Sequence, residues 1–377
     1  MGIKYWEIGN ETFGTGYYDG STNGYSVNYT AAYTGTSRFG IASLSPAYYG
    51  QQVKSFSLAM KAVDPTIKVG AVVSTPPGDY SWDNFNNTGE RWIPQVLSQC
   101  ATNIDFVIAH WYPTASGTGG TLLSGVGTTI PLMIDGATAG LDADTSAGLR
   151  DWINTYRPTD GTNVQIFITE FGYIGSLSSL VIGPVNALFC ADSYATWMDL
   201  GVANIDRLEL NKTTFLGDSY GALANGAAYY AIQMVHAMAG VGDTLVAATS
   251  DTGTIRAHAA LQQSGKLGLL LMNESRTSTQ TVNVTVSSLS LSNSGTRYQL
   301  VTNNFTSVRG RLLSSRNCGL RAFRIQPCPR RYRFSWAGRD WRIPDAQAWH
   351  LSKNLSWSEI FFLYGWLQRK DRQRLGP

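Results

Sequence analysis

The sequence predicts an α/β protein that begins with a barrel-type parallel sheet and continues with an antiparallel β-sandwich. Over residues 1–243, apolar strand-like runs alternate with helix-like segments, which is typical of a parallel sheet whose strands all end on one face. Two glutamates stand directly after two of these runs, where a barrel of this kind presents its chemistry. From Leu245 onwards the apolar pattern takes a period of two, which indicates antiparallel strands over residues 244–327.

The two glutamates are Glu11 and Glu170. Glu11 follows Asn10 in the opening run KYWEIGNE, at the end of a short aromatic and β-branched strand. Glu170 follows the apolar run 164–169 in VQIFITEFGY, and Gly172 opens the loop behind it. Because parallel strands end on the same face, we expect both carboxylates at one mouth of the sheet.

The remaining elements follow from capping signals and spacing. Ser45-Pro46 supplies an N-cap and a first-turn proline, and Asp64-Pro65 ends the helix that begins there. The polar, tyrosine-rich residues 12–39 are too irregular for core and predict a loop that faces substrate. The other predicted elements are strands 67–73, 104–111 and 203–210 and helices 91–101, 142–156, 181–200 and 225–239.

Paired carboxylates at strand ends point to hydrolysis of a glycosidic bond. One carboxyl group must protonate the leaving oxygen, while the other attacks or stabilises the sugar cation. A lone strand-end glutamate is about as often a solvated loop residue. Two of them in matching contexts favour the catalytic interpretation.

YWEIGNE followed by ITEFG resembles the large clan of retaining glycoside hydrolases built on a (β/α)8 barrel, in particular α-L-arabinofuranosidase-like and related polysaccharide-degrading members. The resemblance covers about residues 3–300. It implies that Glu11 is the acid/base, that Glu170 is the nucleophile and that Asn10 binds the sugar 2-hydroxyl. Since the acid/base of this clan follows strand four, the resemblance also implies a TIM-type barrel that is incomplete and starts at strand four.

His110, Trp111 and Tyr112 end the predicted strand 104–111 and are therefore expected at the same mouth. A tyrosine there can hydrogen-bond the nucleophile and an indole can form an apolar floor for a sugar; in the resembling family the matching His and Tyr line the site. The alternative is a core histidine and a packing tryptophan. Glu209, at the end of the last predicted strand, is a weaker candidate of the same kind.

Composition favours an extracellular, carbohydrate-active protein with a neutral partner. Only 15% of the residues are charged and the net charge is +3, too small to imply nucleic acid, and no apolar run is long enough to span a membrane. The four cysteines show no metal-ligand spacing, so no metal and no cofactor is predicted. Cys100 and Cys190 are expected to be buried thiols. A disulfide between Cys318 and Cys328 is left undecided. No signal peptide precedes Met1, so secretion is expected of a longer parent. Oligomeric state is left open.

The end of the chain differs from the rest. Residues 328–377 are rich in Arg and Trp and lack strand alternation, so we expect a tail that is not an evolved domain, with a short amphipathic helix at most over 356–368. The predicted function is a retaining glycosidase that cleaves plant cell-wall polysaccharide or its side chains, of the α-L-arabinofuranosidase or endo-glucanase/xylanase type. The alternative is a non-catalytic carbohydrate-binding remnant of such an enzyme.

Overall fold

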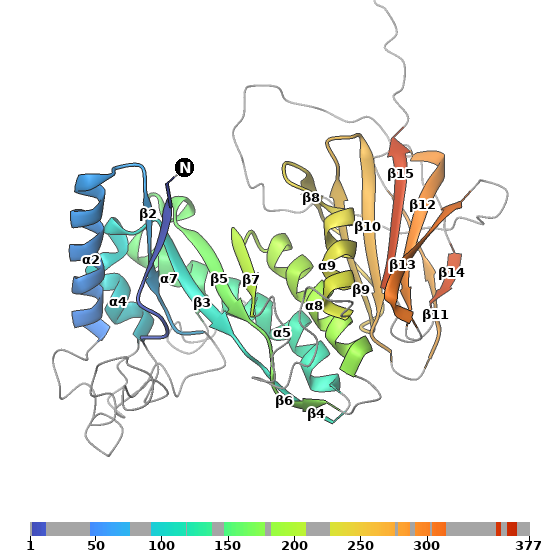
Figure 1. The fold of residues 1–377 in the computed structure, drawn as a ribbon, viewed down its shortest axis with the longest axis horizontal. Helices are drawn as coiled ribbons and strands as arrows, with labels where there is room; N and C mark the ends of the chain where they lie inside the picture. The colour runs from blue at the N-terminus through green and yellow to red at the C-terminus, as the bar shows by residue number, and fades with distance from the viewer. Residues whose placement is uncertain are drawn as a thin grey trace, which may run out of the picture. The chain divides into compact units, whose positions relative to one another are not determined.

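The computed structural model describes residues 2–12, 46–75, 92–117, 119–137, 147–177, 182–208, 227–275, 278–286, 291–301, 304–313, 352–355 and 360–367. The chain divides into two compact units (Figure 1). Unit 1 comprises Met1–Thr114, Ser124–Ile174 and Leu200–Leu208, and unit 2 comprises Ala115–Leu123, Gly175–Asp199 and Glu209–Pro377.

Unit 1 is built on a curled parallel sheet, as the alternation of strands and helices predicted. Its five strands lie in the order β1-β2-β3-β5-β7, and every neighbouring pair is parallel. Because all five run the same way, their carboxyl ends lie along one edge, as in a TIM-like α/β fold. The strands are β1 (Tyr5–Ile8), β2 (Lys68–Val72), β3 (Phe106–Trp111), β5 (Gln165–Phe171) and β7 (Asn204–Arg207).

Two helices of unit 1 begin and end close to where the sequence signals placed them, whereas the helix predicted over 142–156 begins only at Leu149. Helix α2 (Pro46–Val63) starts at the predicted proline and stops before Asp64-Pro65. It packs on α4 (Trp92–Cys100), and Gly50 permits the close approach, because a Cβ there would lie 2.7 Å from the carbonyl oxygen of Val96. Helix α7 (Leu149–Tyr156) and the 3-10 turns η3 (Ala101–Asn103) and η4 (Gly161–Asn163) complete the unit's short elements. The helix α5 (Gly120–Asp135) was not predicted.

One face of the parallel sheet carries a layer of aromatic rings. Phe106 and Phe167 stack with centroids 4.2 Å apart, and the Tyr5 ring lies 6.0 and 5.6 Å from them. Gly70 makes room for this layer, since a Cβ there would lie 2.2 Å from the Phe106 ring. Side chains two residues further along each strand share this face and lie nearer the strand ends. The layer thus forms the floor beneath those residues.

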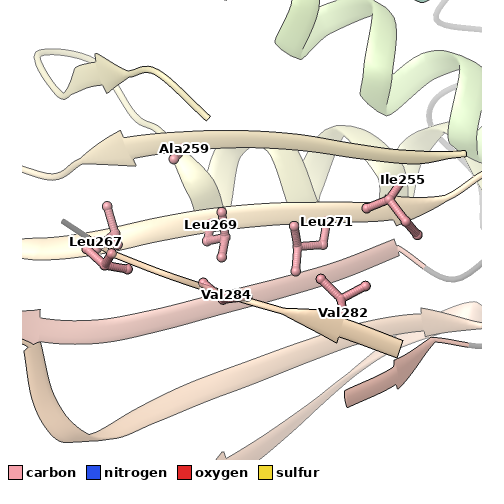
Figure 2. Close-up of a cluster of buried hydrophobic side chains, with 8 residues drawn as sticks. Ile255, Ala259, Leu267, Leu269, Leu271, Val282 and Val284 are labelled. Atoms are coloured by element: carbon pink, nitrogen blue, oxygen red, sulfur yellow. The ribbon is translucent and has the colours of Figure 1, made fainter. Parts of the chain in front are cut away.

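Unit 2 contains a six-stranded antiparallel sheet in the order β13-β12-β15-β10-β9-β8. Branched aliphatic side chains from β9, β10 and the segment that contains β11 form one buried cluster, which includes Leu269, Leu271 and Val284 (Figure 2). Helices α8 (Ile182–Asp199) and α9 (Ala227–Met238) belong to this unit and pack on each other. The strands of the chain's second half are β8 (Thr244–Val246), β9 (Ile255–Leu261), β10 (Lys266–Asn273), β11 (Gln280–Asn283), β12 (Leu291–Val301), β13 (Asn304–Leu313), β14 (Ser352–Leu355) and β15 (Ile360–Leu367). Two smaller sheets have two strands each. One pairs β11 with β14, and the other pairs β4 (Thr114–Gly117) with β6 (Ile174–Leu177).

The C-terminal tail differs from its prediction. Strand β15 pairs with both β10 and β12, so it lies inside the six-stranded sheet, and β14 pairs with β11. The predicted amphipathic helix over 356–368 is therefore wrong, because residues 360–367 form a strand. The expectation that residues 328–377 are not an evolved domain stays a prediction. The run IFFLYGWL is apolar throughout except at Gly365, which suits a central strand better than a helix with one polar face.

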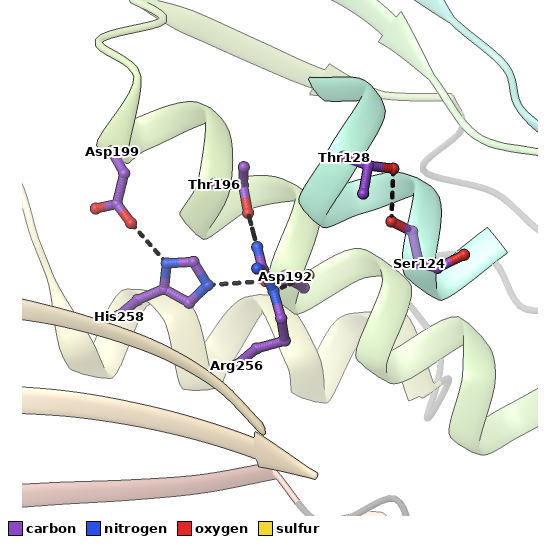
Figure 3. Close-up of polar contacts among 7 residues, drawn as sticks. All are labelled: Ser124, Thr128, Asp192, Thr196, Asp199, Arg256 and His258. Carbon is purple, nitrogen blue, oxygen red and sulfur yellow. Dashed lines mark hydrogen bonds and ion pairs between the residues drawn. The ribbon is translucent and has the colours of Figure 1, made fainter. Parts of the chain in front are cut away.

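A buried ionic network joins α8 to β9 within unit 2 (Figure 3). The fully buried Asp192 accepts hydrogen bonds from Arg256 Nε, at 2.9 Å, and contacts His258 Nε2, at 2.8 Å. His258 Nδ1 lies 2.6 Å from Asp199 Oδ2. Burial acts to lower the pKa of His258, but its two carboxylate partners outweigh this and raise the pKa to about 9. The network thus pairs the buried charge of Asp192 with Arg256 and His258, while Arg256 and Asp199 stay partly exposed.

Other sequence predictions about the fold fare differently. Cys100 and Cys190 are buried free thiols, as expected, whereas Cys318 and Cys328 lie outside the described residues. Most of the predicted loop 12–39 also lies outside them. Among the described helices, none combines the length and apolar character needed to cross a bilayer.

Candidate active site

Glu11 leaves strand β1 through a strained turn. Gly9 has φ +87° and Glu11 has φ +43°, and Glu11 is the sole non-glycine residue with positive φ in the described part of the chain. A left-handed conformation at such a residue costs on the order of 1–3 kcal/mol and is retained where the surroundings enforce it. The turn places the Glu11 side chain, which is 19% exposed, against His110.

Tyr49 of α2 holds the end of β1 from which this turn departs. Its hydroxyl donates to the Ile8 carbonyl oxygen at 2.6 Å and accepts from the Val72 amide at 2.9 Å, so it links the last residues of β1 and β2. The ring stacks on Trp92, whose indole N–H donates to the Val72 carbonyl oxygen at 3.2 Å. Burial of this hydroxyl raises its pKa above the usual range, so Tyr49 acts as a neutral bridge.

His110 lies at the centre of the cluster. Its Nδ1 is 2.7 Å from Glu11 Oε1 and 3.6 Å from Glu170 Oε2, and its Nε2 is 3.0 Å from Thr169 Oγ1. The hydroxyl of Thr75, just beyond β2, donates to the His110 carbonyl oxygen. The imidazole is thus held by side chains from the ends of β1 and β5, its backbone is held by Thr75, and the ring contacts both predicted catalytic carboxylates.

A β-bulge in β5 makes this arrangement possible. Ala109 of β3 pairs with Ile168, but the next residue, His110, pairs with Glu170, so Thr169 is an extra residue on β5. The ladder between β5 and β7 also shifts over the same stretch. In a regular strand, Thr169 and Glu170 would point to opposite faces. The bulge instead brings both side chains to His110.

Tyr112 orients Glu170. Its hydroxyl donates to Glu170 Oε2 at 2.7 Å, a bond that a charged acceptor strengthens. Gly172 allows the Tyr112 ring to lie against the backbone, because a Cβ at this position would lie 3.1 Å from Tyr112 Cε1. The two residues were predicted separately as a site residue and a loop glycine, and the structure joins them.

Two titratable groups of the cluster have shifted pKa values. Burial acts to lower the pKa of His110, but the Glu11 hydrogen bond and the charges of Glu170, Glu11 and Glu7 outweigh it and raise the pKa. Burial also raises the pKa of Glu7, opposed by the charge of His110 and a hydrogen bond with Thr169, while Glu170 and Glu11 raise it further. Perturbed pairs of this kind are typical of catalytic centres.

The predicted substrate-binding residues divide into two groups. His110 and Tyr112 contact the carboxylates, and Asn10 is exposed on the turn before Glu11. Trp111 is only 4% exposed and belongs to the core, so its burial does not support a role as a floor for a sugar. Glu209 lies outside the described residues.

Sequence reasoning missed three residues that build this site: Glu7, Tyr49 and Thr169. Glu7 stands four residues before Glu11 in the same motif, and Thr169 directly precedes Glu170, so period-two alternation could have marked Glu7 as inward-facing. Tyr49 gave no signal, because its partners are backbone groups of distant strands.

Glu11, His110 and Glu170 each offer one atom within 4.8 Å of the others, a spacing that also suits a metal ion. Hydrogen bonds already engage these three side chains, which is the arrangement that acid–base chemistry requires. The prediction that no metal or cofactor takes part stays a prediction.

Comparison with solved structures shows a similar fold at low sequence identity. The α-L-arabinofuranosidase from Thermotoga maritima matches with a TM-score of 0.59 and 15% identity over 96% of this chain. A family 44 endoglucanase from Clostridium thermocellum matches with a TM-score of 0.61 and 15% identity over 97%, and a bifunctional glucanase-xylanase from a metagenome library with 0.58 and 16% over 86%. The chain has a glycoside hydrolase fold.

This chain spans 66% of the length of the arabinofuranosidase and of the endoglucanase, and 60% of the glucanase-xylanase. No protein-family model matches the sequence, and a search of curated proteins returns no match. The similarity to these solved structures confirms, at the level of the fold, the resemblance noted in the sequence.

Proposed function

We propose that this chain carries the catalytic pair of a retaining glycosidase, with Glu170 as nucleophile and Glu11 as acid/base. The observation that carries the proposal is the convergence of the two carboxylates on one imidazole, with an oxygen of each within 4.8 Å of the other. Retaining enzymes keep their carboxyl groups about 5–5.5 Å apart, whereas inverting enzymes leave about 6.5–9.5 Å for a water molecule. The short spacing supports double displacement.

In the first step, a Glu170 oxygen attacks the anomeric carbon while the bond to the leaving oxygen breaks. Glu11 transfers its proton to that oxygen, so the leaving group departs as a neutral alcohol. In the second step, Glu11 takes a proton from water, whose oxygen replaces Glu170 at the anomeric carbon. Two inversions restore the original configuration. Tyr112 holds Glu170 in line, and the N–H of His110 stabilises Glu11 when it is an anion.

The substrate class we propose is plant cell-wall polysaccharide or its side chains. The names of the similar structures support this proposal: arabinofuranosidase, endoglucanase, glucanase-xylanase and xyloglucanase. In keeping with this substrate, we propose that the parent protein is secreted. We further propose that the parallel sheet is part of a (β/α)8 barrel incomplete in this chain, and that the sheets of unit 2 form a β-sandwich.

Activity on aryl glycosides tests the proposal. The unmutated chain, called the parent from here on, is assayed together with the variants Glu170→Gln and Glu11→Gln. The substrates are arabinofuranosides, cellobiosides and xylobiosides, each with a dinitrophenyl and with a phenyl leaving group. We expect Glu170→Gln to lose turnover on every substrate. Glu11→Gln should keep a fast first release of dinitrophenol, because that leaving group needs no proton, but should turn over slowly afterwards, because no base activates the water of the second step. Asp251→Asn, in an exposed loop of unit 2, is the matched control and should retain activity.

A Glu170→Gln variant as active as the parent would refute the assignment of the nucleophile. If the parent chain hydrolyses no member of the panel but is retained on insoluble cellulose or xylan, the chain is a carbohydrate-binding remnant and the catalytic proposal is wrong.

A further inference from the structure

Glu7 is a third carboxyl group that the double displacement leaves unused. It follows Tyr5 by two residues on β1, so it lies on the same sheet face, between the aromatic layer and the catalytic carboxylates. Its Oε1 is fully buried and has no hydrogen-bond partner among the described residues. A buried, unsatisfied carboxylate oxygen is costly, and such groups are retained where they have a role.

Glu7 is connected to Glu11 through two side chains. Thr169 hydrogen-bonds the Glu7 carboxyl group, and its Oγ1 lies 3.0 Å from His110 Nε2. His110 Nδ1 in turn lies 2.7 Å from Glu11 Oε1. The order of contacts is therefore Glu7, Thr169, His110 and Glu11, and the β5 bulge places Thr169 in the middle of it.

The single hydroxyl proton of Thr169 makes the protonation of Glu7 and of His110 depend on each other. When the hydroxyl donates to an ionised Glu7, its oxygen can only accept from His110, which must then carry a proton on Nε2 as well as on Nδ1. When the hydroxyl donates to Nε2 instead, His110 keeps one proton, on Nδ1. The charge on the ring beside Glu11 thus follows the direction of the Thr169 hydrogen bond.

We propose that Glu7 is a positioning residue that acts through Thr169 to keep both nitrogens of His110 as hydrogen-bond donors. The imidazolium then lies 2.7 Å from Glu11, where it stabilises the Glu11 anion that remains after proton transfer. Other charged groups that face the ring are Glu11 at the end of β1 and Glu170 on β5. The raised pKa of His110 agrees with this arrangement, whereas burial raises the pKa of Glu7 and so acts against its ionised form, opposed by the charge of His110 and by Thr169. The effect on catalysis rests on the proposed function, whereas the hydrogen-bond arrangement does not.

The state of His110 can be measured without any substrate. Nitrogen-15 NMR of histidine-labelled protein at pH 7 distinguishes protonated from unprotonated ring nitrogens, and loss of one signal set in a His110→Asn variant identifies His110 among the four histidines of the chain. We expect both His110 nitrogens to be protonated in the parent. Glu7→Gln and Thr169→Val should each shift Nε2 towards the unprotonated position, whereas Thr169→Ser, which keeps the hydroxyl, should match the parent.

The double variant Glu7→Gln/Thr169→Val tests whether Glu7 and Thr169 act on His110 through one connected path, called the relay here, or independently of each other. A shift of the His110 signal no larger than that of either single variant supports the proposal, because both substitutions interrupt the same series of hydrogen bonds. An additive shift, or a Glu7→Gln signal equal to the parent, overturns it. If Glu7→Gln does not fold, Glu7→Asp keeps the charge but withdraws the carboxyl group, and an unchanged His110 signal in that variant overturns the proposal equally.

Kinetics then test the catalytic consequence. We expect Glu7→Gln to lower kcat/KM by about tenfold or more on phenyl glycosides and to change the pH profile, with a smaller effect on dinitrophenyl glycosides. Equal losses on both substrates would overturn the link to Glu11. If the NMR shifts occur as expected while the parent hydrolyses no glycoside, the relay stands and the proposed function fails.

Discussion

At the scale of single residues, the site depends on side chains that hold the two carboxylates as much as on the carboxylates themselves. His110 contacts Glu11 and Glu170 together, and Tyr112 contacts Glu170 alone. Sequence reasoning identified these four residues because each ends a predicted strand. It did not identify Thr169, since regular alternation would turn this side chain away from Glu170, and only the bulge reverses that.

Tyr112→Phe tests the hydrogen bond to Glu170. Loss of a hydrogen bond to a charged group costs about 1.5–3 kcal/mol, so we expect kcat/KM to fall roughly 10- to 150-fold while the fold is kept. Steady-state kinetics measure this, with Tyr48→Phe on the surface of α2 as the matched control. Unchanged kinetics for Tyr112→Phe would show that the Glu170 carboxylate is held by other groups.

At the scale of elements, Tyr49→Phe tests how α2 supports the end of β1. The substitution removes the hydroxyl that joins the Ile8 carbonyl to the Val72 amide, and a buried group left unsatisfied costs about 1–3 kcal/mol. We expect a lower unfolding midpoint and, because Glu11 departs from this strand end, a lower kcat/KM on phenyl glycosides. A destabilised variant with full activity would show that the Glu11 turn is fixed elsewhere.

The network between α8 and β9 makes stability depend on pH. The pKa of His258 is about 9 in the folded state, above its ordinary value of 6.5, so its stabilising contribution is complete below pH 6.5 and is lost as pH rises through about 9. Burial, with the charge of Asp192, also raises the pKa of Glu274, whose ionisation acts in the same direction. The expected loss from His258 is at most about 3 kcal/mol.

Thermal unfolding between pH 6.5 and 9 measures this loss. In His258→Gln the midpoint should be lower at pH 6.5 and should change less with pH, whereas the exposed His236→Gln on α9 should behave like the parent. An identical pH dependence in His258→Gln would mean that the network does not govern the stability of unit 2.

At the scale of the whole molecule, the parallel order of strands and helices was predictable because cap residues, prolines and apolar runs mark each element locally. The predictions for α2, β2, α4, β3, β5, α8, β7 and α9 are confirmed within one to three residues at their ends. The tail was not predictable in this way. Its strand β15 lies between β10 and β12, and a pairing between segments so far apart leaves no local signal.

Truncation tests the place of the tail in the fold. Removing residues 329–377 deletes β15 and leaves β10 and β12 with unpaired edges. We expect a loss of about 3 kcal/mol or more, which lowers the unfolding midpoint by roughly 6–12 °C, or aggregation. Removing only residues 368–377, beyond β15, is the control. An unchanged midpoint after the longer truncation would contradict the pairing of β15.

The central claim is that Glu170 attacks the sugar while Glu11 handles the proton, and trapping the covalent intermediate tests it most directly. 2-Deoxy-2-fluoro glycosides with dinitrophenyl leaving groups slow the second step of a double displacement and let the glycosyl-enzyme accumulate. Mass spectrometry of proteolysed protein should then find one added sugar on the peptide that contains Glu170, and none after Glu170→Gln. A label on any other residue, or hydrolysis of the unsubstituted glycoside with inversion and no label, would contradict the account.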